Sequence, residues 1–171
     1  MEPVVHTGDG VAAAEVANVL VMLWQKPASA ARWNWQVKLL EQMALHENEG
    51  VLLLNIILST STPPDAALRK QMTTYLKSSG TRMRKLIAVP LGDSVWQSVV
   101  RTIIRGVALI SGVSDRQVVV ATIAEAIAVT REQGGRASAA ELERAVGLVT
   151  AALDVNGSAR AAPPRSPAGP V

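Results

Sequence analysis

Residues 50–65 read GVLLLNIILSTSTPPD, and this stretch decides the fold. The run from Val51 to Leu58 is apolar apart from Asn55, and it lies between a glycine and four hydroxyl residues. An apolar run of this length with turn residues at both ends predicts a strand that is buried on both faces, as in a parallel sheet. The prolines and Asp65 that follow predict the start of a helix, which we expect over residues 63–79.

The rest of the chain alternates in the same way between short apolar runs and amphipathic segments. Further strands are expected over residues 16–25, 85–89 and 117–121, with a weaker edge strand within residues 4–14. Further helices are expected over residues 29–49, 95–111, 123–132 and 139–153, several with a Ser, Thr or Asp cap. The alternation predicts an α/β domain with a mostly parallel sheet of four to five strands.

The domain organisation follows from where this alternation ends. We expect one α/β domain over residues 1–135, an additional C-terminal amphipathic helix over residues 136–155, and a tail over residues 156–171. The tail reads NGSARAAPPRSPAGPV, which is rich in Pro, Ala, Gly and Ser. A segment of this composition cannot bury a core, so we expect it to be disordered.

The composition excludes several classes of site. The chain of 171 residues is 49% apolar and has no cysteine, which excludes disulfides, thiolate zinc sites and cysteine nucleophiles. Its net charge is only +3, too small for the electrostatic footprint of a nucleic-acid-binding protein. The N-terminus does not resemble a signal peptide, and Arg101 and Arg105 interrupt the most apolar long segment. We therefore expect a cytoplasmic protein.

The sequence offers no catalytic or metal-binding constellation. His6 and His46 are the only histidines, and His46-Glu47 would need a second histidine at position 50 to form a zinc motif, where the chain has Gly50. The glycine patterns that bind nucleotide phosphates and the nucleophile motif of hydrolases do not occur. We expect no enzyme activity, no metal and no cofactor.

The order of elements resembles the STAS-like family, whose fold is that of anti-sigma-factor antagonists. The resemblance covers roughly residues 16–133 and includes the polar turn after Val51–Leu58 and the last strand entering a helix, VVVATIAEAIAV. Antagonists of this family carry a phosphorylatable Ser or Thr in an Asp-Ser pair followed by Gly at this turn. This chain has neither the pair nor the glycine there, which indicates a divergent bacterial member.

The hydroxyl turn has two interpretations. By resemblance, Ser59, Thr60, Ser61 and Thr62, together with Asp65 and Arg69 of the next helix, form a partner surface with a phosphorylation or anion site near the helix N-terminus. The simpler interpretation is that Thr62 or Ser61 caps the helix and Pro63 or Pro64 begins it.

The helix over residues 95–111 also has two interpretations. Its wide apolar stripe favours packing on the core, with Trp96 at its start as the residue expected to be exposed. Arg101 and Arg105 lie four residues apart on one face, so a partner or membrane surface formed with Trp96 is the alternative.

Together with the resemblance, these patterns predict a non-enzymatic regulatory or protein-interaction module in a bacterial signalling pathway. We expect its partner to be a protein. Nucleic acid is not expected as a partner, and a membrane surface is not favoured. The alternatives are a small-molecule or lipid-binding module that uses the helix over residues 95–111, and a homo-oligomeric component that uses the last amphipathic helix.

Overall fold

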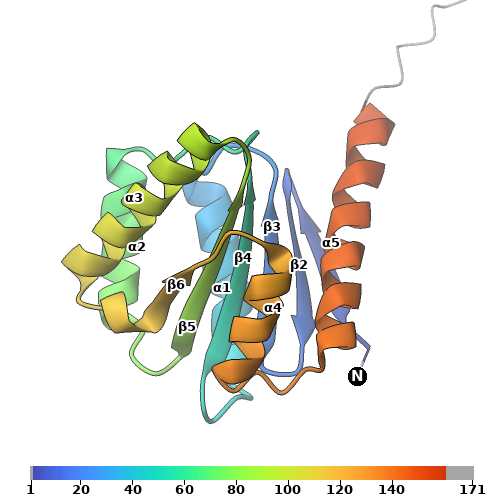
Figure 1. Cartoon of the computed structure of the whole chain (residues 1–171), viewed down its shortest axis with the longest axis horizontal. Coiled ribbons are helices and arrows are strands. Elements are labelled where there is room, and N and C mark those ends of the chain that lie inside the picture. The colour runs from blue at the N-terminus through green and yellow to red at the C-terminus, as the bar shows by residue number, and fades with distance from the viewer. Residues whose placement is uncertain (1, 161–171) are drawn as a thin grey trace, which may run out of the picture.

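The computed structural model of the chain describes residues 2–160, with side chains as far as Asp154 (Figure 1). In this part of the chain a mixed six-stranded sheet lies between two layers of helices. The strands are β1 (Val4–Gly8), β2 (Val11–Val16), β3 (Val19–Trp24), β4 (Val51–Leu58), β5 (Met83–Leu91) and β6 (Gln117–Val119). The helices are α1 (Ala30–Ala44), α2 (Ala66–Ser78), α3 (Ser94–Ser111), α4 (Ile123–Glu132) and α5 (Ala139–Arg160), with a 3-10 turn over Ser114–Arg116.

The strands lie in the sheet in the same order as in the chain. The first three form an antiparallel meander, and β3, β4, β5 and β6 are parallel to one another. Each of α1, α2 and α3 connects one parallel strand to its next neighbour in the same direction. Because such crossovers are right-handed, all three helices lie on one face of the sheet. The helices α4 and α5 follow the last strand and cover the other face (Figure 1).

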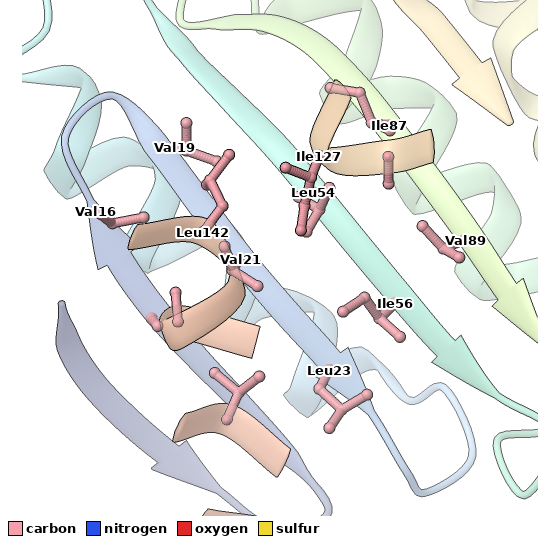
Figure 2. Packing of buried hydrophobic residues seen from close by; sticks show 14 of the residues in the cluster. Val16, Val19, Val21, Leu23, Leu54, Ile56, Ile87, Val89, Ile127 and Leu142 are labelled. Atoms are coloured by element: carbon pink, nitrogen blue, oxygen red, sulfur yellow. The ribbon is translucent and has the colours of Figure 1, made fainter. Parts of the chain in front are cut away.

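The face under α4 and α5 is closely filled by aliphatic side chains. Figure 2 shows Val19, Val21 and Leu23 of β3 beside Leu54 and Ile56 of β4. Ile127 of α4 and Leu142 of α5 pack onto these rows, and both are at least 94% buried. This aliphatic layer fixes the sheet from one side.

The prediction of an α/β domain with strands and helices in alternation is confirmed, whereas the number of strands was underestimated. The segment expected as one strand over residues 16–25 begins with a tight turn, because Ala17 has φ 50° and Asn18 turns the chain. Asn18 is fully buried; its amide donates to the carbonyl of Gly134 and accepts from the N–H of Arg136. The alanines before this turn form β2, in the centre of the meander.

Two helix boundaries also differ from the prediction. The first helix does begin at the Ser29 cap but ends at Ala44, not near residue 49. The prolines do not begin α2, because Asp65 is its N-cap and accepts from the N–H of Leu68 at 2.8 Å. Pro63 and Pro64 instead extend the connection from β4, so the turn is longer than expected.

Helix α5 is part of the core. Its stripe packs on the sheet, with Leu142, Val149 and Leu153 at most 2% exposed and Val146 partly buried. The chain itself thus covers the stripe that suggested a homo-oligomer. The helix continues to Arg160, into the segment expected to be disordered, and the rest of that segment, residues 161–171, lies outside the described residues.

Replacing Leu142 with Ala is expected to lower the free energy of unfolding by about 2–5 kcal/mol, because the side chain is fully buried and leaves a cavity. Urea denaturation measures this change. Leu109→Ala is the matched control: its side chain is 73% exposed, so the expected change is within about 0.5 kcal/mol. Equal effects of the two substitutions would contradict the assigned packing of α5.

Candidate ligand-binding cavity

A cavity of about 100 Å³ lies between the sheet and the layer formed by α1, α2 and α3. Side chains of the sheet form its floor, namely Trp24, Leu53, Asn55, Ile57, Met83, Leu86 and Gln117. The helices supply its roof, namely Trp33 and Gln36 of α1, Leu68, Met72 and Leu76 of α2, and Trp96, Val100, Ile103, Ile104 and Val107 of α3. Apolar cavities of roughly 150 Å³ in other proteins admit benzene, so a space of about two-thirds that volume limits an occupant to about one ring.

The alternation of side chains along β4 places its residues on the two faces. Leu52, Leu54 and Ile56 belong to the layer under α4 and α5, whereas Leu53, Asn55 and Ile57 face the other three helices. Leu53 is 2% exposed, but Asn55 and Ile57 are only half-buried, although they lie on a central strand. The helical layer therefore covers β4 less completely toward the carboxyl end of the strand.

The rim of the cavity lies at this carboxyl end. Ala28 follows β3, and Ser61, Thr62, Pro63 and Pro64 follow β4. The N–H of Ala28 donates to the carbonyl of Thr62, which ties the two connections together. The carboxyl ends of parallel strands are where open α/β sheets bind ligands.

Five residues of the cavity lining each have a polar atom that is buried without a hydrogen-bond partner among the described residues. These atoms are Nε1 of Trp24, Oε1 of Gln36, Oδ1 of Asn55, Nε1 of Trp96 and Nε2 of Gln117. Gln36 is only 2% exposed and Trp24 only 5%. A buried donor or acceptor without a partner costs roughly 1–3 kcal/mol, so these five residues are the candidates for hydrogen bonds to an occupant of the cavity.

Charged side chains do not line this cavity within the part of the chain that the structure describes. Its wall combines aliphatic residues with three indoles, three amides and two hydroxyl groups. Pockets that hold small organic molecules have this composition: mostly apolar, with a few placed hydrogen-bonding groups.

Contacts between α1 and α2 hold the roof in place. The rings of Trp33 and Tyr75 meet edge to face, with centroids 5.7 Å apart. The hydroxyl of Tyr75 donates to Glu41 Oε1 at 2.9 Å, and Arg82 donates to Glu41 Oε2 at 2.8 Å. Burial of the Tyr75 phenol, followed by its hydrogen bond to Glu41, raises the pKa of Tyr75 well above its usual range, so the phenol remains a donor to Glu41.

The residues of the predicted partner surface after β4 lie in different environments in the structure. Ser59 and Thr60 are exposed, and the Thr60 hydroxyl donates to the carbonyl of Gln25 at 2.7 Å. Ser61 is only 3% exposed and lines the rim together with the exposed Thr62. Asp65 serves as the α2 cap, and Arg69 of the first turn is half-buried.

The second group of predicted residues lies on α3. Trp96 is half-buried, with its indole N–H in the cavity wall, so the expectation that it is exposed is wrong. A Cβ on Gly92 would lie 2.5 Å from Cδ1 of this indole, so the missing side chain of Gly92 makes room for the ring. Arg105 is exposed, whereas Arg101 is half-buried and its Nε has no partner among the described residues.

Helix α3 contributes both to the cavity and to the outer surface. Val100 and Val107 are buried against the cavity. The same helix exposes four large apolar side chains, namely Val95, Val99, Leu109 and Ile110. The apolar stripe of α3 is thus wider than the part of this helix that packs against the rest of the domain.

The site residues that sequence patterns do not predict are Trp24, Gln36, Asn55 and Gln117. Asn55 did carry a signal, because it is the one polar residue in VLLLNIIL. Gln36 carried a second signal, because it lies three residues after Trp33 and four before Leu40, on the apolar stripe of the predicted helix. Neither signal shows that the two amides face one cavity, since that depends on how α1 packs against β4.

Comparison with protein-family models, with curated proteins and with solved structures finds no match to this chain. Among the described residues, all helices are too short or too polar to cross a lipid bilayer.

The Asn55 amide is expected to cost stability in the unoccupied protein. Asn55→Leu, which replaces a polar atom without a partner by a methyl group of similar size, should raise the free energy of unfolding by about 1 kcal/mol. Asn18→Leu is the matched control, because it removes two hydrogen bonds and should lower the free energy by about 1–3 kcal/mol. Thermal and urea unfolding measure both, and destabilisation by Asn55→Leu as large as that by Asn18→Leu would rule out this assignment.

Proposed function

We propose that this domain is a non-enzymatic small-molecule-binding module that holds its ligand between the sheet and α1, α2 and α3. The observation that carries the proposal is the cavity of about 100 Å³ whose lining includes five residues with a buried polar atom that has no partner among the described residues. Proteins retain costly buried polar groups chiefly where function uses them, since apolar replacements would be more stable.

The position of the cavity adds support. Its rim lies at the carboxyl ends of β3 and β4, where helix and strand connections surround the entrance. The roof is anchored through the Tyr75–Glu41–Arg82 contacts, so the cavity keeps its shape between two fixed layers. A cavity that already has its shape lowers the entropic cost of binding.

Occupancy can be measured with toluene, a neutral one-ring probe, in two-dimensional ¹H–¹⁵N spectra. The chain has four tryptophans, and Trp24, Trp33 and Trp96 line the cavity while Trp35 does not. We expect toluene to shift the indole N–H signals of these three saturably and to leave that of Trp35 in place. Absence of any saturable shift would overturn the proposal.

A pair of adjacent substitutions provides the control for this experiment. Val100 lines the cavity and is 5% exposed, whereas Val99 is 42% exposed and lies outside the lining. Val100→Phe should fill the cavity and weaken toluene binding at least about tenfold, and Val99→Phe should bind as the wild type does. Thermal unfolding checks that both variants are folded, and equal toluene affinity of the two would contradict the location of the site.

A second proposal keeps the role suggested by the resemblance, a STAS-like regulatory module that contacts a protein partner in the bacterial cytoplasm. It is supported by the alternation of strands and helices and by the exposure of Ser59, Thr60 and Thr62 beside the cavity rim. A partner on this turn would touch the connection that borders the ligand.

Ser59→Arg is expected to lower recovery of such a partner from the native cell about tenfold, because a bulky charge would occupy the contact. Quantitative affinity capture with mass spectrometry measures the recovery. Thr74→Arg on the exposed part of α2 is the matched control and should leave recovery unchanged. Equal recovery with both variants would argue against a partner at the turn.

A further inference from the structure

We infer that the cavity selects an uncharged ligand of about one-ring size that carries a hydroxyl, carbonyl or amide group. This inference rests on the proposed function and adds the chemical class of the ligand. Three observations carry it: the charge of the wall, the kinds of polar atom in it, and the size of the space.

The wall of the cavity excludes ions. No Asp, Glu, Lys, Arg or His of the described chain belongs to its lining. Moving an ionised carboxylate or ammonium group from water into such a site costs several kcal/mol when no opposite charge compensates it. A ligand with a charged group could therefore bind only with that group outside the rim.

The buried polar atoms define what a neutral ligand can offer. The indole N–H groups of Trp24 and Trp96 and the Nε2 of Gln117 are donors, whereas Oε1 of Gln36 and Oδ1 of Asn55 are acceptors. Because these donors and acceptors all belong to residues that line one cavity, a group that accepts and donates, such as a hydroxyl or an amide, suits it. A hydrocarbon would fill the space and leave all five atoms without partners.

The central acceptor is on the sheet and its counterpart is on the helix above. Asn55 lies in the middle of β4, between Met22 of β3 and Ala88 of β5. Ala88 brings only a methyl group beside the Asn55 side chain. Gln36, in α1, contributes an amide from the roof. A ligand between the two layers would have the side chain of Asn55 on one side and that of Gln36 on the other, with its apolar body against the aliphatic side chains of α2 and α3.

The test compares three one-ring molecules on the full chain, using the same tryptophan N–H signals. These are toluene, benzyl alcohol, which adds a neutral hydroxyl, and benzoate, which is charged at pH 7. We expect benzyl alcohol to bind about tenfold more tightly than toluene, as one good hydrogen bond to a buried group allows. Benzoate is expected to bind at least about 100-fold more weakly than benzyl alcohol.

The variant Asn55→Leu should abolish the preference. We expect its affinity for benzyl alcohol to fall to that for toluene, whereas its affinity for toluene stays at or above the wild-type value. A residue with a merely structural role would change both affinities together. The matched variant Val99→Leu, on the outer face of α3, should retain the wild-type preference.

The outcomes separate this inference from the proposed function. If toluene shifts the three indole signals but benzoate binds as tightly as benzyl alcohol, the site exists and the inference of a neutral ligand is wrong. If toluene and benzyl alcohol bind equally and Asn55→Leu changes neither, the role of the buried amides is wrong. If toluene causes no saturable shift, the proposed function itself fails.

Discussion

Strand β4 must bury both of its faces, and the rest of the structure depends on that constraint. It bonds to β3 on one edge and β5 on the other, so the sheet continues on both sides. Its alternate side chains face two different helical layers. A strand in this position requires helices above and below it, which the crossovers α1 to α3 supply on one face and α4 and α5 on the other.

The two layers meet this requirement differently. Under α4 and α5 the side chains are aliphatic and nearly all fully buried, as Figure 2 shows for β3, β4 and β5. Under α1 to α3 the layer includes tryptophans and amides, and the cover thins toward the carboxyl ends of the strands. One side of the sheet is thus a filled core that supports the fold. On the other side the packing is incomplete, and residues with hydrogen-bonding groups line the space that remains.

This difference gives a physical account of residues that are otherwise unexplained. Asn55 and Gln36 lie where leucine would give a more stable protein, since a buried acceptor without a partner is costly. Asn18 shows the contrast, because it is fully buried but has two backbone partners that fix the turn between β2 and β3. Of these buried amides, the partnered one has a structural role, and the two without partners belong to the cavity.

The sequence by itself determined which segments become strands and helices. The strand Val51–Leu58 and the helix over residues 123–132 appear in the structure at the predicted positions, because hydrophobic period and capping are local properties. The division of residues 4–16 into two strands, β1 and β2, was missed, since alanines of β2 are buried by packing against α5, far along the chain. The cavity was decided only by tertiary structure: whether Trp24, Gln36, Asn55, Trp96 and Gln117 surround one space depends on how five separate elements pack, and no spacing within one segment encodes that.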